Sequence, residues 1–379
     1  MLDLQYPIPF LPNIRNEKKA ATRGYIWGKP VPQSLILQMM GLVVQKSGQI
    51  RIEHDQINKL GITETDLIAE RWIVSDDREY PSCVPMPDGR SIPFFEILKE
   101  KGEAILGKYH WEEKGPFLST IMKLIDTHSD YQRGSLSAQV HPKKGYPLRP
   151  PKTEMWKGKG QIYIGWNKDM TEEKIREAVE NGTLEKCMNS VQLDGNNLVL
   201  VSGGVIHAIR YGTFISEWSK APDKEDLKKG HIKEATLSLY DRTDGKTPRP
   251  QKEDIKGVMD VLKHARTFNK TRNYLCHSRE MINDGKGNTL SILFKTPDII
   301  VEELRISKSF ESSVEKRGLP IFVEKGVIEV RQGKKILDRL QQGEERFFPH
   351  SMKKFMLVSK GDTPALIQRW YAPLKNEDF

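Results

Sequence analysis

The sequence predicts a mainly β protein with helical insertions, built from two jelly-roll β-sandwich domains. Its 379 residues, 37% of them hydrophobic, are enough for two sizeable cores. Short segments rich in β-branched residues, at 161–166 and 197–209, are bounded by Gly or Asn, and similar pairs of segments occur at 319–330 and 347–358. Strands of this kind, with turn signals about every ten residues, are typical of β-sandwiches and jelly rolls.

Helices interrupt this pattern. A helix is predicted to begin after Thr171, a suitable N-cap, and to end near Asn181, with a restart after Thr183. Residues 252–265 place apolar side chains on one helical face. Two further segments, 94–106 and 115–127, are helix or strand candidates, and periodicity does not decide the second. The polar segment 265–275 is the best boundary, so we expect one domain at 1–270 and another at 271–379.

The net charge of +9 comes from 60 basic and 51 acidic residues that are interleaved along the chain. No long single-sign run and no stripe of aromatic and basic residues is present, which argues against nucleic-acid binding. A mildly basic enzyme with an anionic substrate fits the same composition.

The expected location follows from what the sequence lacks. No apolar segment is long enough to span a bilayer, and the N-terminus has no basic region followed by an apolar one. The three cysteines, Cys83, Cys187 and Cys276, are widely spaced and suit a reducing compartment. We therefore expect a cytoplasmic protein without a membrane partner.

Four polar residues in the middle of the chain suit a divalent metal. Gln139 and His141 are two apart on a predicted strand and so share a face, Glu154 lies on what we interpret as the next strand, and His207 follows Gly203-Gly204. Two imidazoles, a carboxylate and an amide oxygen are a suitable ligand set. Each residue alone is more often an ordinary surface or hydrogen-bonded side chain, and the pattern by itself leaves both interpretations open.

Longer motifs connect these residues to a known family. The segments "LSAQVHP", "KTEMW" and "VSGGVIHAI", with a helical segment between the last two, resemble the class I phosphomannose isomerases (mannose-6-phosphate isomerases). Further similarity lies in "YIWGK", "ERWIVSDD" and "GPFLSTIMKLIDT". The resemblance implies two cupin domains: a metal-binding cupin with helical insertions at 1–270 and a cupin-like β-sandwich at 271–379.

The resemblance also implies roles for individual residues. It makes Gln139, His141, Glu154 and His207 the ligands of one divalent ion, most often Zn²⁺. It places Lys152, two residues before the glutamate ligand, in the active site as a group that holds substrate oxygens or phosphate. It also places Glu217 in the active site.

The sequence departs from the family pattern around the family's catalytic arginine. Ser238 stands at that position, after an insertion, and either Arg242 or Arg249 could replace the arginine; we assign Arg242. Residues 32–67 form a further insertion. The C-terminal domain has no ligand set, and its His350 is interpreted as a turn residue.

The expected function is therefore a metal-dependent aldose–ketose isomerase that interconverts mannose 6-phosphate, or a related sugar phosphate, and fructose 6-phosphate. The alternative is a catalytically silent or substrate-altered cupin that binds sugar, with Ser238 marking lost chemistry. A third hypothesis is an iron cupin oxygenase, since two histidines and a carboxylate also suit non-haem iron. The glutamine ligand and the helical insertion argue against it.

Overall fold

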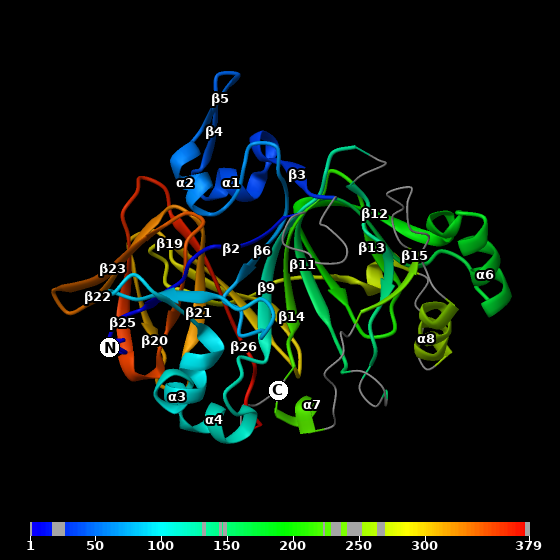
Figure 1. Cartoon of the computed structure of the whole chain (residues 1–379). Helices are drawn as coiled ribbons and strands as arrows, with labels where there is room; N and C mark the ends of the chain where they lie inside the picture. Colours follow the sequence, from blue (N-terminus) through cyan, green and yellow to red (C-terminus); the bar gives the residue numbers. More distant parts are fainter. Residues whose placement is uncertain are drawn as a thin grey trace.

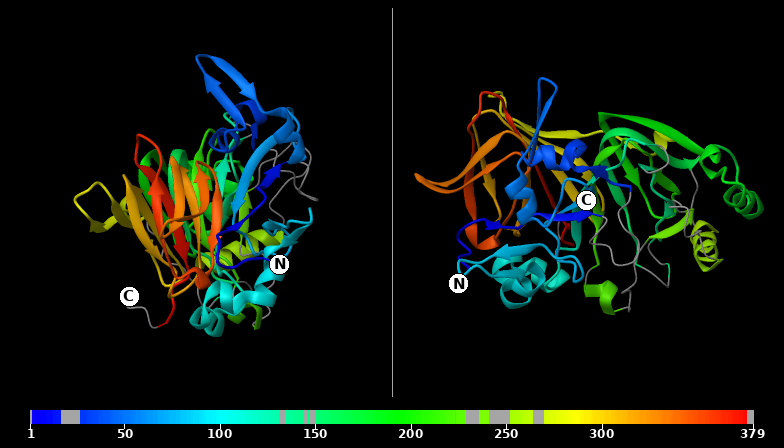
Figure 2. Two further views of the ribbon diagram at one scale, coloured as in Figure 1. Left: turned by 90° about the vertical axis from the view of Figure 1, so that its left-hand side faces the viewer. Right: turned by 45° about the horizontal axis from the view of Figure 1, so that its top comes forward.

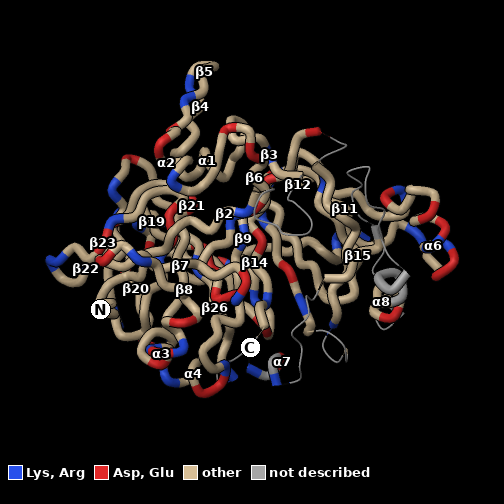
Figure 3. The backbone as a smooth tube through the Cα atoms, in the orientation of Figure 1, with Lys and Arg blue, Asp and Glu red and all other residues tan. Residues whose placement is uncertain are grey.

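The computed structural model describes residues 2–16, 27–130, 134–143, 146, 150–222, 224–228, 236–240, 252–263 and 270–375. Two β-rich halves lie side by side (Figures 1 and 2). The mainly β fold with few helices confirms the predicted fold class. Basic and acidic residues are interleaved over both halves (Figure 3).

The first half is a curved sheet of eleven strands in the described part of the chain. Its main path runs, in spatial order, through β15 (Leu237–Tyr240), β10 (Ala138–Val140), β13 (His207–Ile209), β11 (Glu154–Trp166), β14 (Phe214–Lys220), β9 (Thr120–Asp126), β6 (Leu67–Ile73) and β2 (Asn13–Asn16). Three strands lie off this path: β12 (Met188–Val201), β16 (Leu275–Cys276) and β3 (Lys29–Pro30). The predicted strand at 197–209 is thus divided between β12 and β13, and His207 begins the second of these.

The second half is a β-sandwich of two sheets. The seven-stranded sheet contains, in spatial order, β1 (Ile8–Pro9), β24 (Glu345–Phe348), β21 (Leu319–Lys325), β26 (Ala365–Tyr371), β19 (Ile300–Ile306), β18 (Thr289–Lys295) and β17 (Arg279–Asn283). The four-stranded sheet contains β20 (Ser309–Ser313), β25 (Lys354–Ser359), β22 (Val327–Gln332) and β23 (Lys335–Gln341). Apolar side chains such as Ile321, Val330 and Leu357 fill the space between them. The strands predicted at 319–330 and 347–358 are confirmed.

One apolar core joins the two halves. Met155 and Trp218 of the first sheet belong to the same cluster as Phe294, Phe322 and Trp370 of the second half. The Trp218 and Phe294 ring centroids are 6.1 Å apart. The strand β1, from near the N-terminus, completes the seven-stranded sheet, so residues on both sides of position 270 build it. The division at residue 270 stays a prediction.

The helices are short and lie outside the sheets. The predicted helix after Thr171 is α6 (Glu172–Glu180), with the Thr171 side chain accepting from Lys174 N and Asn181 as the C-cap, and the restart is the 3₁₀ turn η2 (Leu184–Cys187). Outside the insertion at 32–67, the other helices in the described residues are α3 (Phe94–Leu106), α4 (Lys108–Lys114), α7 (Lys224–Lys228), α8 (Lys252–Lys263), η3 (Thr271–Asn273) and η4 (His350–Met352). None of the helices in the described ranges has the length and apolarity needed to cross a bilayer.

The two ambiguous segments take different forms: 94–106 is the helix α3, whereas 115–127 contains the strand β9. Six of the seven residues of β9 are buried, because one face of the strand points into the first half and the other into the core shared with the second half. A strand buried on both faces has no alternating pattern, which explains why periodicity did not identify it.

The insertion at 32–67 is a small structural unit that projects from the top of the molecule in Figure 1. It contains η1 (Val31–Gln33), α1 (Leu35–Met39), β4 (Val43–Lys46), β5 (Gln49–Ile52) and α2 (His54–Lys59), and a separate hairpin further on contains β7 (Cys83–Pro85) and β8 (Ser91–Pro93). The buried carboxylate of Asp126 on β9 anchors the insertion: it accepts from Leu35 N at 2.6 Å and lies 3.3 Å from Lys29 Nζ.

Candidate metal centre

Three neighbouring strands of the first sheet bring the predicted ligands together. Gln139 on β10 lies directly opposite His207 on β13, His141 follows β10 by one residue, and Glu154 is the first residue of β11, which also pairs with β13. Alternation along the strand places Gln139 and His141 on the same face. Because His207 lies opposite Ile164, near the other end of β11, Glu154 meets the two histidines across the curved sheet and not at a shared strand end.

The Gly203-Gly204 turn makes this approach possible. A Cβ atom on Gly203 would lie 2.5 Å from Pro142 O, which is closer than van der Waals contact allows. Gly204 has a φ of 85° and donates its N–H to His141 O at 2.7 Å. The two glycines thus let the segment before His207 pack directly against the segment that carries His141.

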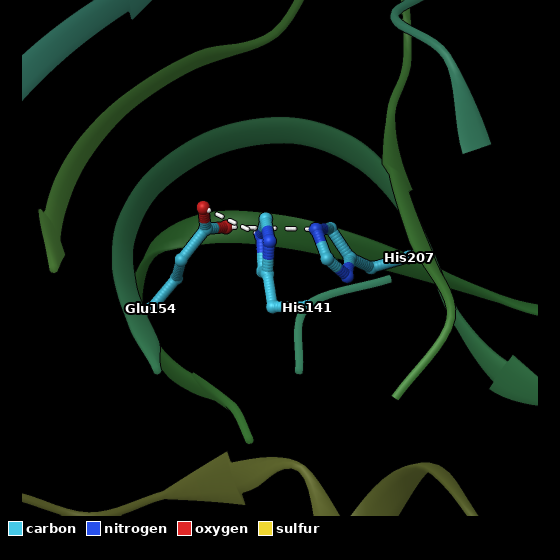
Figure 4. A group of neighbouring side chains, drawn as sticks. All are labelled: His141, Glu154 and His207. Atoms are coloured by element: carbon cyan, nitrogen blue, oxygen red, sulfur yellow. Dashed lines mark ion pairs between the residues drawn. The ribbon is translucent and has the colours of Figure 1, made fainter. Parts of the chain in front are cut away.

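His141, Glu154 and His207 form a compact buried triad (Figure 4). One candidate ligand atom from each residue lies within 4.8 Å of the others. Oε1 of Glu154 is 2.8 Å from Nε2 of His141, and Oε2 of Glu154 is 3.6 Å from Nε2 of His207. The three side chains are at most 4% exposed.

The surroundings of His207 prepare its Nε2 atom for a ligand. Nδ1 donates to Val205 O at 3.0 Å, which fixes the tautomer of the ring. The proton is then on Nδ1, and the lone pair of Nε2 is free to bind a ligand. Burial, together with the positive charge of His141, lowers the pKa of His207 to about 4, so the ring is neutral near pH 7. Neutral imidazole is the form that binds metal.

A buried nitrogen of the triad lacks the hydrogen bond that it would need in the absence of a metal. Nε2 of His207 is buried and makes no hydrogen bond with any described residue. A buried polar atom without a partner costs stability unless another group satisfies it. A divalent cation bound between the two imidazoles and the carboxylate would satisfy these atoms. Gln139 lies directly opposite His207 and so shares its face of the sheet.

Lys152 connects the triad to a second carboxylate. Its Nζ atom lies 2.5 Å from Glu154 Oε1 and 3.9 Å from Glu217 Oε1. Burial alone would raise the pKa of Glu154, but the charges of Lys152 and His141 hold that pKa well below its ordinary value. Burial alone would lower the pKa of Lys152, but the two carboxylates raise it. Burial and the negative charge of Glu154 raise the pKa of Glu217 to about 7.

Lys123 and Glu70 are two charged residues that the sequence analysis did not assign to the site. Lys123 on β9 lies directly opposite Glu217 on β14, and Trp72 on β6 lies directly opposite Lys123. Nζ of Lys123 is 4.4 Å from the Trp72 ring centroid, and Trp72 Nε1 donates to Glu70 Oε2 at 2.6 Å. Directly opposite residues share a face, so these side chains continue the charged surface that begins at Lys152. The signal that could have identified Lys123 is a lysine in a strand whose other residues are buried.

The predicted arginine replacement is not tested by the structure. Ser238 on β15 lies directly opposite Gln139, at the border of the candidate centre. Arg242 and Arg249 lie outside the described residues. His350 lies in the turn η4, as expected, with Nδ1 2.9 Å from Val314 O.

Comparisons with known proteins agree with this architecture. No protein-family model matches the sequence, and no curated protein matches it. Among solved structures, the mannose 6-phosphate isomerase from Bacillus subtilis superposes with a TM-score of 0.67 at 17% identity, over 96% of this chain and 99% of that one. A phosphomannose isomerase variant from Salmonella typhimurium superposes with a TM-score of 0.65 at 12% identity, over 97% and 99%. The protein therefore has the cupin fold of these phosphomannose isomerase structures along almost its whole length.

Proposed function

We propose that the protein is a metal-dependent aldose–ketose isomerase that interconverts mannose 6-phosphate, or a related sugar phosphate, and fructose 6-phosphate. The observation that carries the proposal is the buried His141–Glu154–His207 triad, with Lys152 between Glu154 and Glu217. The similarity in fold to phosphomannose isomerases supports it.

In this proposal, His141, Glu154 and His207 hold one divalent ion, which we propose to be Zn²⁺, and Gln139 completes the set. Two neutral imidazoles and one carboxylate suit zinc, and a catalytic site keeps one position open. When bound, the ion would supply positive charge that stabilises the negative charge developing on the substrate during isomerisation.

Isomerisation transfers one hydrogen between C2 of the aldose and C1 of the ketose through a cis-enediol. Glu217 is the residue we propose for this transfer, because a pKa of about 7 lets its carboxylate both accept and return a proton near neutral pH. Its carboxylate takes the proton from C2 and returns it to C1, while the hydroxyl proton on O2 ends on O1. No oxidant or reductant is needed.

Lys152 and Lys123 provide positive charge along the same surface. Lys152 is a charged ammonium whose Nζ lies between Glu154 and Glu217, where it can hold a substrate oxygen. Lys123, opposite Glu217, extends the positive charge toward β6, where a phosphate could bind. We propose Arg242 as the third catalytic residue, replacing the arginine that Ser238 does not supply.

The test is a coupled assay with metal-loaded protein on mannose 6-phosphate, glucose 6-phosphate and further sugar phosphates. Isomerisation of at least one of them, lost when the metal is removed with a chelator, is the expected result. Tight sugar binding by calorimetry without turnover on any of them would instead support the second candidate, a catalytically silent sugar-binding cupin. The observation that favours this second candidate is the short neutral Ser238 beside Gln139.

A further inference from the structure

A hollow lies between the insertion at 32–67 and the second half of the molecule. Its volume is about 490 Å³, large enough for a small organic molecule. Four separate segments line it: the N-terminal segment, the insertion, the strand β6 and the turn between β23 and β24. We call it the insertion pocket, and its lining includes Phe10, Lys59, Leu60, Arg71, Glu345 and Arg346.

The insertion pocket is separate from the candidate metal centre. Successive side chains on β6 point to opposite faces of the sheet, so Arg71 points away from the face that carries Glu70 and Trp72. Arg71 lies opposite Ile14 and Leu124, which belong to the apolar core shared by the two halves. The first sheet therefore lies between the pocket and the metal centre.

A buried charged residue, Arg71, lies at the base of the pocket. Arg71 is 2% exposed, donates from Nη1 to Gly343 O at 2.6 Å and pairs through Nη2 with the buried Glu345. Its Nε atom is buried and makes no hydrogen bond within the described residues. Arg71 lines the pocket, and its guanidinium group has one N–H donor without an acceptor among the described residues, which costs stability.

The mouth of the pocket carries an uncompensated positive charge. Glu345 pairs with Arg71, Nε of Arg346 donates to Asp338 at 2.8 Å, and Nη2 of Arg346 lies 3.9 Å from the lining carboxylate of Glu344. These charges are therefore engaged within the protein. Lys59, exposed at the end of α2, forms no ion pair with any residue that the structure describes. The lining therefore attracts an anion.

Apolar side chains form the remaining wall. Phe10, Met40, Leu42 and Leu60 come from the N-terminal segment and the insertion. An apolar wall with a few convergent polar groups is the usual composition of a small-molecule site, in which the apolar part contributes affinity and the polar groups fix orientation.

We propose that the insertion pocket binds a small organic anion, with its acidic group at Lys59 at the mouth and its ring or apolar chain directed inward against Phe10 and Leu60, toward Arg71 at the base. The acidic group is a phosphate or a carboxylate. The site is distinct from the catalytic site and requires no metal.

The experiment is a fluorescence titration of the metal-loaded protein with 8-anilinonaphthalene-1-sulfonate, an anion that carries apolar rings. We expect saturable binding at one site per chain. Lys59→Glu should raise the Kd at least tenfold, because it reverses the charge at the mouth, and Leu60→Trp should do the same by filling the pocket. Lys46→Glu, a charge reversal on the same insertion at a residue that does not line the pocket, is the matched control and should bind as the wild type does.

Displacement by phenyl phosphate or by benzoate then distinguishes the two acidic groups. His207→Ala should leave probe binding unchanged, which separates this site from the metal centre. The absence of saturable one-site binding overturns the proposal, as does an unchanged Kd in both Lys59→Glu and Leu60→Trp. Loss of probe binding in His207→Ala also overturns it, because the probe would then occupy the metal centre.

Discussion

Ser238 on β15 lies directly opposite Gln139 on β10. Gln139 is in turn opposite His207, so the serine lies one strand away from the candidate metal centre. A serine hydroxyl is short and neutral and cannot stabilise a developing enediolate as a guanidinium does. The proposed isomerase therefore needs another cation near this position.

Arg242→Ala should lower the turnover number by roughly 10²- to 10³-fold, the usual cost of removing one donor to a developing oxyanion. Bound metal should not change. Steady-state kinetics on the best sugar phosphate measure the effect, with Arg249→Ala as the matched variant. Full activity of Arg242→Ala, with collapse of Arg249→Ala, would move the role to Arg249.

His141→Ala and His207→Ala should each sharply reduce bound metal, because each removes one of the two imidazoles that lie beside Glu154. Gln139→Ala should reduce it less, since a neutral amide is the weakest ligand of the set. Elemental analysis after dialysis measures the stoichiometry. The exposed His277 provides the control variant His277→Ala. Wild-type metal content in both triad variants would contradict the assignment.

Lys152→Ala should weaken transition-state binding of a sugar phosphate by roughly 1.5–3 kcal/mol, the value of a hydrogen bond to a charged group. The change is measured as kcat/KM, with metal content checked in parallel. Lys159→Ala removes an exposed lysine from the same strand and should have no effect. Normal kcat/KM in the Lys152 variant would exclude this lysine from the active site.

The stability of the protein should depend on pH through Asp126. Burial raises the pKa of Asp126 from 3.8 to about 6, despite the nearby Lys29. The folded state therefore binds the proton more tightly than the unfolded state does. The resulting stabilisation is complete below pH 3.8 and is lost as the pH rises through about 6, by about 3 kcal/mol.

Asp126→Asn cannot titrate, so its stability relative to wild type should rise by about that amount between pH 4 and pH 7, seen as a larger free energy of unfolding. Urea unfolding of the metal-free proteins at both pH values measures the difference. Asp362→Asn, which removes an exposed carboxylate, is the control. Parallel pH profiles for wild type and Asp126→Asn would show that this carboxyl group has an ordinary pKa.

Gly343→Ala should destabilise the contact between the insertion and the turn that follows β23. Gly343 has a φ of 83°, and a Cβ atom there would lie 2.5 Å from Met39 O. Gly333 also has a positive φ, but an added Cβ there meets nothing within 4 Å. Overpacking typically costs about 1–3 kcal/mol of folding stability. The free energy of unfolding of Gly343→Ala should therefore fall below that of Gly333→Ala by about this amount. Equal losses in thermal or urea unfolding would mean that the insertion does not pack against this turn.

Some features of the molecule follow from the sequence because they depend on neighbouring residues. The Thr171 cap and the Asn181 end of α6 were predicted because a helix end is satisfied by side chains within one turn of it. Gln139 and His141 were predicted to share a face because residues two apart in a strand point to the same side, whatever the rest of the fold is. The pattern also indicated Glu154 and His207 as candidate ligands, and the resemblance of the longer motifs favoured the four residues as one metal centre.

Other features depend on which distant strands pair, and only the tertiary structure decided them. Burial of β9 on both faces removed the alternation that would have identified it as a strand. Lys123 lies beside Glu217 because of the β9–β14 register, which joins residues 94 positions apart in the sequence. Strand register is determined by the packing of whole faces, and no local pattern records it. The sequence thus determined the ligand types and the local elements, whereas the tertiary structure brought the His141–Glu154–His207 triad together beside Lys152.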